Sequence, residues 1–384
     1  MSEEVITYIP DIYEKYHCLA DKCPTSCCKG WVLPVDDETY ERYQNLPGLY
    51  GRHVRSHVAK HPKNPDMKII KRLMGRCPFW NCDKTCQFQA NGTPELMPLV
   101  CRTYPRETVE FYKEARMTFV LSCPAIAKLF IKHPGRLTFH KADVPTEVFW
   151  KIENEDEKMF AFLKKEEEKL LDFFWNEKED MASLWQAMYA YVYGKHDLII
   201  RDKLSETEDI ELTLDKKNQG VYALLNRPTY SFFKIETIDH MVLDCINYGA
   251  LSVREPKFYH LIKGYLDIFG KQYLDSVDDY FDKELRKMLR ECPDAYLRYQ
   301  SYFSWCMNEL FFLAYENYNI IRQFLYCVLY TQLYMIFDLV DYMEKGKDRS
   351  PERLAEVLYI CEQGIQHNPS LKHNLMEVIR REFL

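Results

Sequence analysis

Cysteine is distributed so unevenly along this chain that it limits the possible folds more than any other feature. Of 14 cysteines in 384 residues, nine lie within the first 123 positions, in the segments YHCLADKCPTSCCKGW, CPFWNCDKTC, CRTYPR and LSCPA. Eight of them form the candidate metal-ligand set: Cys18, Cys23, Cys27, Cys28, Cys77, Cys86, Cys101 and Cys123. The ninth, Cys82, falls between two members of the set. Such a density of thiols indicates a region built around metal or around disulfide bonds.

The cellular compartment decides between metal binding and disulfide bonds, because it sets whether thiols stay reduced. The N-terminal sequence MSEEVITYIPD lacks a basic stretch followed by an apolar one, so we expect no secretory signal. The longest uncharged apolar run, 323–337, is shorter than the roughly 18–20 residues that span a bilayer. We therefore expect a cytoplasmic protein without membrane insertion, whose thiols stay reduced. Metal binding is then favoured, although a secreted disulfide scaffold would explain the same cysteine count.

Eight cysteines are enough for two four-thiolate sites, or for one such site with several structural thiols. Zinc and iron–sulfur clusters both accept four thiolates, so the sequence leaves the choice between them open. Cys27 and Cys28 are adjacent, and successive side chains diverge, so these two are expected to serve different sites unless one packs inward. Proline follows Cys23, Cys77 and Cys123 and keeps each of them extended, which is common at iron–sulfur ligands.

The cysteine-rich first part of the chain also differs from the remainder in its net charge. Residues 1–141 contain 21 Lys and Arg against 15 Asp and Glu, a net charge of +6, whereas residues 142–384 carry −13. Nearby positive charge lowers the pKa of thiols and stabilises an anionic metal–thiolate centre. The basic residues form no dense run interleaved with aromatic residues, so we expect no binding of nucleic acid.

The hydrophobic pattern predicts a mainly α protein, in which a small cysteine-rich α+β metal-binding region is followed by an all-α helical bundle. We place the first domain at 1–141 and the helical domain at 142–384. A β-hairpin is expected at 110–122 and a polar loop at 202–220. Helices are expected at 148–174, 238–251, 259–269, 275–289, 295–315 and 318–343, and one beginning at Pro351.

The CRTYPR segment places two cations and an aromatic ring beside Cys101. Arg102 and Arg106 can offset the negative charge of a metal centre, or bind a carboxylate or phosphate. They can equally form salt bridges with the acidic helical part. Tyr104 lies between them and is the best candidate for an aromatic residue of the site.

The cysteine-containing segments quoted above resemble the flagellin lysine-N-methylase family. Their N-terminal part is also similar to a broader cysteine-rich family described as zinc- or iron-chelating. The LSCP segment is similar to the methylase-type extension, and IQHNP at 365–369 also fits the family. Cys82 is not part of the pattern.

The resemblance implies an enzyme that transfers methyl groups from S-adenosylmethionine to lysine ε-amines of flagellin, with an iron–sulfur cluster, of the 4Fe–4S type, as cofactor. Arg102, Tyr104 and Arg106 would then be catalytic residues, and the two arginines would bind the cofactor. The sequence has no glycine-rich fingerprint of a doubly wound nucleotide-binding fold, so the methyl donor would be held in another way. The alternative is a non-enzymatic zinc- or iron-binding protein, in which the metal staples a partner-binding helical domain.

Overall fold

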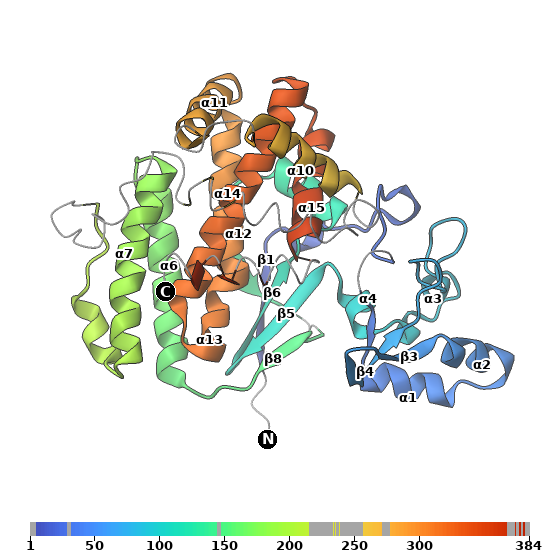
Figure 1. Cartoon of the computed structure of the whole chain (residues 1–384). Coiled ribbons are helices and arrows are strands. Elements are labelled where there is room, and N and C mark those ends of the chain that lie inside the picture. The colour runs from blue at the N-terminus through green and yellow to red at the C-terminus, as the bar shows by residue number, and fades with distance from the viewer. Residues whose placement is uncertain are drawn as a thin grey trace.

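The computed structural model describes residues 5–28, 32–143, 147–214, 256–270 and 277–366, together with residues 233, 235, 238, 373, 376, 377, 379 and 380. Most of the described residues are helical, and both β-sheets are built from residues before 153 (Figure 1). The predicted mainly α class, with a cysteine-rich α+β region, is confirmed. The predicted helix at 238–251, apart from Ile238, and positions 367–369 of the IQHNP segment lie outside the described residues.

A five-stranded mixed sheet occupies the centre of the molecule, in the order β7-β1-β6-β5-β8. Its strands are β1 (Ile6–Pro10), β5 (Arg106–Phe111), β6 (Glu114–Phe119), β7 (Phe139–Lys141) and β8 (Trp150–Ile152). The predicted hairpin is confirmed as β5 and β6, which begin slightly earlier than expected. Strands β1 and β6 are parallel, as are β5 and β8, whereas β1–β7 and β5–β6 are antiparallel.

A small lobe lies to one side of this sheet, at the lower right of Figure 1. It contains a three-stranded sheet and short helices: β2 (Pro34–Val35), β3 (Val58–His61), β4 (Asn64–Ile70), α1 (Asp37–Asn45), α2 (Gly48–Ser56), α3 (Gln87–Ala90) and α4 (Leu99–Thr103). Asp36 caps α1 by accepting from the Thr39 amide at 2.9 Å, and its other carboxylate oxygen accepts from the Leu99 amide at 2.7 Å. One carboxylate therefore fixes the start of α1 and the start of α4 together.

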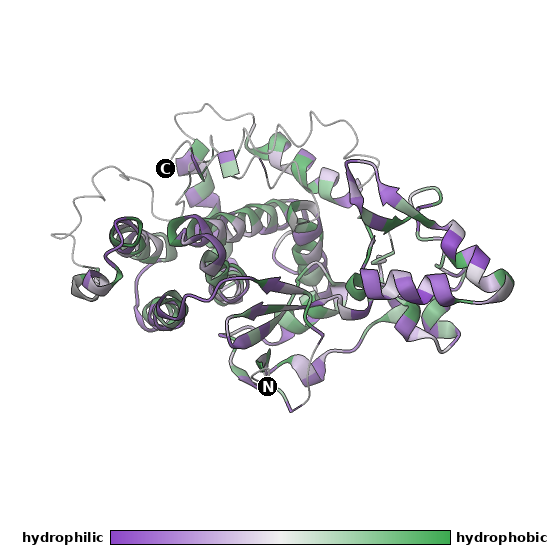
Figure 2. Ribbon diagram, turned by 90° about the horizontal axis from the view of Figure 1, so that it is seen from below, coloured by the Kyte–Doolittle hydropathy of each residue, from purple (hydrophilic) through white to green (hydrophobic). Residues whose placement is uncertain are grey.

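Most of the other described residues are helical. Their helices are α5 (Pro124–Lys132), α6 (Glu157–Asn176), α7 (Met181–Ile200), η4 (Leu204–Asp209), α10 (Pro256–Ile268), α11 (Val277–Glu291), α12 (Asp294–Leu310), α13 (Ala314–Asn317), α14 (Ile320–Lys345) and α15 (Pro351–Gln366). Hydrophobic and hydrophilic residues alternate along these helices, as expected when each buries one side (Figure 2). The predicted helix start at 148 is wrong, because 150–152 pair with β5 and Asp156 caps α6 only afterwards.

Helix α14 is the central helix of the bundle. Among the described helices it alone is long and apolar enough to cross a membrane by length and composition, but 89% of its apolar window is buried inside the protein. Its Asp338 receives hydrogen bonds from Arg298, Tyr299 and Arg349. Burial raises the pKa of this carboxyl, but the two arginines outweigh burial and lower it overall. This helix is therefore fixed in the core by ion pairs as well as by apolar packing.

Two hydrophobic cores hold the described residues together. The large core joins the five-stranded sheet to the helices, as when Trp305 of α12 donates to the carbonyl of Phe119 in β6 at 2.8 Å. The small core lies within the small lobe and contains Tyr43, whose hydroxyl donates to the Leu96 carbonyl at 2.7 Å. The five-stranded sheet thus packs with the helices, although its first strands precede position 141. The boundary at 141 stays a prediction.

The contact between α10 and α15 gives a first test of the packing. A Cβ atom added at Gly364 would lie 2.4 Å from the Phe258 ring. We expect Gly364→Ala to lower the free energy of unfolding by about 1–3 kcal/mol, since overpacking costs more than the roughly 1 kcal/mol gained in helix propensity. In a Phe258→Ala background the same change should cost less, because the clashing ring is gone. Chemical denaturation of the four proteins measures this; an equal cost in both backgrounds would contradict the packing.

Candidate functional site

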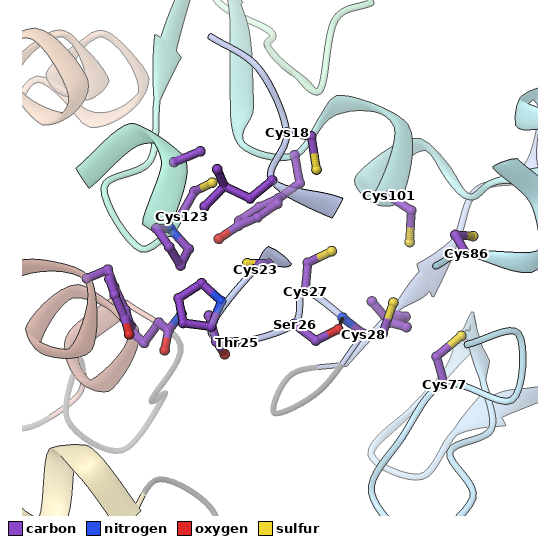
Figure 3. A pocket seen from close by; sticks show the side chains of 18 of the residues that line it. Cys18, Cys23, Thr25, Ser26, Cys27, Cys28, Cys77, Cys86, Cys101 and Cys123 are labelled. Carbon is purple, nitrogen blue, oxygen red and sulfur yellow. Dashed lines mark hydrogen bonds between the residues drawn. The ribbon is translucent and has the colours of Figure 1, made fainter. Parts of the chain in front are cut away.

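A cavity of about 480 Å³ lies between the small lobe, the end of the five-stranded sheet and the C-terminal helices. All eight candidate cysteines line it: Cys18, Cys23, Cys27, Cys28, Cys77, Cys86, Cys101 and Cys123. Figure 3 shows their sulfur atoms around this cavity. Cys82 does not line it and is exposed. The structure therefore brings together residues more than 100 positions apart in the sequence.

Four segments carry these sulfurs. The first four cysteines lie on the loop between β1 and β2, and Cys123 precedes α5 at its N-cap position. Cys77 and Cys86 are the ends of a loop that is closed by a turn in which the Asn81 amide donates to the Thr85 carbonyl at 2.9 Å. Cys101 lies in α4. The loops position the thiols because each one is tied at its ends to a strand or a helix.

Thiol contacts link the members of the set. Cys28 accepts hydrogen bonds from the thiols of Cys27 and Cys77, which lowers its pKa and raises theirs. Burial, with the nearby Cys28 and Cys86, raises the pKa of Cys101. Burial also raises the pKa of Cys123 to about 12. Without a cation, most of these groups are therefore held as neutral thiols.

The donor set fits a thiolate-binding metal or cluster. It consists of sulfur atoms, which zinc and iron–sulfur clusters prefer, and among the described residues no Asp or Glu side chain lines the cavity. Within the described part of the chain, no group of three or more His, Cys, Asp or Glu is placed closely enough to hold a single metal ion. A single zinc ion needs all its thiolates at about 2.3 Å, whereas a polynuclear cluster places its thiolates on different metal atoms. The choice between zinc and an iron–sulfur cluster therefore stays open.

The two candidate arginines have different surroundings. Arg102 forms a salt bridge with Glu147 at 2.9 Å and donates to the Thr39 hydroxyl at 3.2 Å and to the Met97 carbonyl. Its guanidinium therefore joins the small lobe to residues beyond position 141, as the salt-bridge reading of the sequence expected. Arg106 donates to backbone carbonyls of α4, and no carboxylate pairs with it among the described residues. Both line the cavity.

Tyr104 lies at the meeting point of the cysteines and the helices. Its hydroxyl is 3.2 Å from that of Ser122, and the Ser122 carbonyl accepts from the Gln363 amide at 2.9 Å. Burial, followed by the nearby Cys123, raises the pKa of Tyr104. Tyr16 lies beside the same thiol, and burial likewise raises its pKa. Both phenols are therefore neutral and present polar edges to the cavity.

A wall of the cavity comes from helices that the sequence analysis did not connect with the site. It is formed by Lys257 and Phe258 of α10 and by Tyr359, Ile360 and Gln363 of α15. Lys257 forms a salt bridge with Glu356 at 2.5 Å. These residues lie more than 130 positions beyond the last cysteine of the set. In the sequence, the one indication of this wall was that α15 carries polar residues, such as Gln363, among its apolar ones.

The fold and this cavity define a mostly helical protein with a cysteine-lined site. The chain is similar to the lysine-N-methylase of Salmonella typhimurium, with 22% identity over 152 residues, which is 38% of each chain. It has the same similarity to the lysine-N-methylase of Salmonella choleraesuis. It is 23% identical over 140 residues to the flagellar biosynthetic protein FliU of Salmonella muenchen, covering 35% of this chain and 82% of that protein.

These relatives confirm a distant likeness to lysine-N-methylases. The match spans well under half the length of the curated methylases. No protein-family model matches the sequence. No solved structure matches it either.

The placement of Arg102 can be tested by stability. We expect Arg102→Met to lower the free energy of unfolding by about 1.5–3 kcal/mol, because it removes charged hydrogen bonds and leaves the Met97 carbonyl without its donor. Arg52→Met, on the exposed face of α2, is the matched control and should change stability by less than about 0.5 kcal/mol. Urea unfolding of both variants measures the difference. Equal stabilities would contradict the structural role of Arg102.

Proposed function

We propose that this chain is a protein-lysine N-methyltransferase that acts on flagellin in the cytoplasm, with S-adenosylmethionine as methyl donor and an iron–sulfur cluster held by the cysteines. The likeness to Salmonella lysine-N-methylases supports methyl transfer to lysine. The likeness to a flagellar biosynthetic protein supports flagellin as substrate. The observation that carries the proposal is the convergence of eight thiols on one cavity with an aromatic wall.

Methyl transfer to lysine needs a neutral amine. The lone pair of Nζ forms a bond with the methyl carbon while the bond from that carbon to the sulfonium sulfur breaks, and its electrons stay on sulfur as the neutral thioether. Removal from water favours the neutral amine over the ammonium ion. Tyr16, Tyr104, Phe258 and Tyr359 line the cavity and can exclude water from a lysine side chain.

The methyl donor would bind in the cysteine-lined cavity. The five-stranded sheet has neither the strand order nor the all-parallel pairing of a doubly wound nucleotide-binding fold. The cavity volume of about 480 Å³ lies within the roughly 300–1,000 Å³ common for small-molecule sites. Arg106, which has no carboxylate partner among the described residues, would bind the donor carboxylate.

A bound iron–sulfur cluster would supply an open iron that can take the amino and carboxylate groups of the donor. The Cys18-x4-Cys23-x3-Cys27-Cys28 spacing differs from the CxxxCxxC pattern of radical enzymes that bind the donor in this way, which argues against this mode of binding. We therefore propose polar methyl transfer, in which the chain positions the two reactants. Zinc remains the alternative metal for the same thiolates.

A second candidate function is a metal-stapled binding protein without catalysis. It is favoured by the position of Cys77, Cys86 and Cys101, which pack against the small core. Few large apolar residues form that core, and small lobes of this kind are commonly stabilised by metal. Incubation of the anaerobically purified protein with labelled donor and flagellin separates the two functions. Label in flagellin lysines supports the enzyme, and its absence from protein that carries its metal contradicts it.

Tyr104 is expected to position the reactants through its hydroxyl. Tyr104→Phe removes the contact with Ser122 and should lower kcat/KM for methyl transfer roughly 2- to 10-fold, equivalent to one hydrogen bond of about 0.5–1.5 kcal/mol. Tyr193→Phe, an exposed tyrosine of α7, is the matched control and should retain full activity. Initial rates with labelled donor measure both. Full activity of Tyr104→Phe would contradict the positioning role of this hydroxyl but would leave the proposed reaction standing.

A further inference from the structure

A second cavity lies at the opposite end of the β5–β6 hairpin from the cysteines. Strand β5 begins at Arg106, which lines the cysteine cavity, and ends at Phe111, which lines the second one. The second cavity has a volume of about 530 Å³, within the roughly 300–1,000 Å³ common for small-molecule sites. Strands β1, β6 and β7 and helices α6 and α12 contribute to its lining. The proposed methyl transfer makes no use of it.

Arg116 places a charged group at a fixed position in this cavity. Its Nη1 donates to both carboxylate oxygens of Glu167, at 2.7 Å each, and Glu167 is only 5% exposed. The guanidinium carbon also lies 4.9 Å from the ring centre of Phe312 and 5.5 Å from that of Phe139. The buried ion pair and the two rings together hold the guanidinium in place.

One side of this guanidinium is open. Its Nε–H and Nη2–H groups form the side of the fork that can bind a carboxylate through two parallel hydrogen bonds. Among the described residues neither group has an acceptor, because Nη1 makes the hydrogen bonds of Arg116 to Glu167. The Arg116 side chain is 20% exposed, and neither nitrogen is among the fully buried polar atoms. A carboxylate that entered the cavity would therefore meet two parallel donors already in position.

The walls around this guanidinium are largely aromatic. Five aromatic side chains line the cavity: Tyr8, Phe111, Phe139, Phe160 and Phe312. The ring centre of Phe312 lies 4.8 Å from that of Phe111 and 5.4 Å from that of Phe160, so these three rings form one cluster. Flat apolar walls favour a flat apolar ligand, because its burial removes apolar surface from water on both partners. The cavity thus combines a position for a carboxylate with a position for an aromatic ring.

The charges that line the cavity favour a ligand with one negative charge. Three cations and three carboxylates are present: Arg116, Arg136, Lys164, Glu114, Glu167 and Glu168. Lys164 pairs with Glu114 at 2.8 Å, and Arg136 pairs with Asp172, which does not line the cavity. Because the lining carries no surplus of positive charge, a doubly charged phosphate would be repelled by its carboxylates more strongly than a single carboxylate would.

We propose that this second cavity binds a small aromatic carboxylate. The carboxylate accepts hydrogen bonds from Nε and Nη2 of Arg116, and the ring of the ligand packs against the aromatic walls. Among the described residues no cysteine lines this cavity. The inference is therefore independent of the proposed metal binding and of methyl transfer.

Titration calorimetry with simple probes tests the class of ligand. Benzoate is compared with benzylamine, benzyl alcohol, acetate and phenyl phosphate on the anaerobically purified full chain at one ionic strength. We expect benzoate to bind at least roughly 10-fold more tightly than each of the others, since each lacks the carboxylate, the ring or the single charge. Any probe that binds as tightly as benzoate would overturn the proposal.

Variants show whether Arg116 is the group that binds. Glu167→Gln keeps the guanidinium and removes a nearby negative charge, so benzoate should bind at least as tightly as it does to the native protein. Combining Arg116→Gln with Glu167→Gln removes both charges of the buried pair without leaving one unpaired, and should weaken benzoate binding roughly 10- to 100-fold. Arg201→Gln, which breaks an exposed pair with Asp197, is the matched control and should bind benzoate like the native protein.

Arg106→Gln distinguishes the two cavities. Arg106 lines the cysteine cavity, so this variant should retain full benzoate binding, and a loss would place the probe there and reject the inference. If the double variant does not fold, Glu167→Gln and Arg106→Gln still decide, because weaker binding in either contradicts the assignment to Arg116. Absence of benzoate binding would leave the proposed methyl transfer untouched, and absence of methyl transfer would leave this site untouched.

Discussion

The rest of the structure depends on the meeting of cysteine side chains from four segments in the gap between two hydrophobic cores. Desolvation of thiols favours their neutral form, whereas metal binding requires thiolates, so a bound cation would compensate for that cost. The same binding would join the small lobe to the central sheet, since the Cys18–Cys28 loop contacts both. Folding of the small lobe and occupation of the cavity are consequently coupled in this account.

The site also requires the helical part of the chain. Helices α10 and α15 close the cavity opposite the cysteines, and Gln363 donates to Ser122, which contacts Tyr104. Arg102 makes a further connection through Glu147. The cysteines therefore lie at an interface between parts far apart in sequence, where water can be excluded. The cavity is therefore complete only when the cysteine-rich segment packs with helices α10 and α15.

Much of this arrangement could be predicted from the sequence. The eight cysteines that were predicted to converge, a set without Cys82, do line one cavity, because density and spacing carry that information; their role as metal ligands stays a prediction. The hairpin and the long core helices followed from hydrophobic periodicity. Strands β1, β7 and β8 could not be foreseen, because short strands depend on partners far away in sequence. The wall residues Phe258 and Tyr359 were missed for a related reason: on an amphipathic helix, a side chain that lines a cavity looks like one that fills a core.

X-ray absorption spectroscopy at the iron and zinc edges, on anaerobically purified full-length protein, tests the central claim most directly. Sulfur atoms gathered around metal predict a first coordination shell of sulfur at about 2.3 Å, the length of metal–thiolate bonds, and iron–iron scattering if the centre is a cluster. A first shell of nitrogen and oxygen, or a protein with neither metal, would contradict the account.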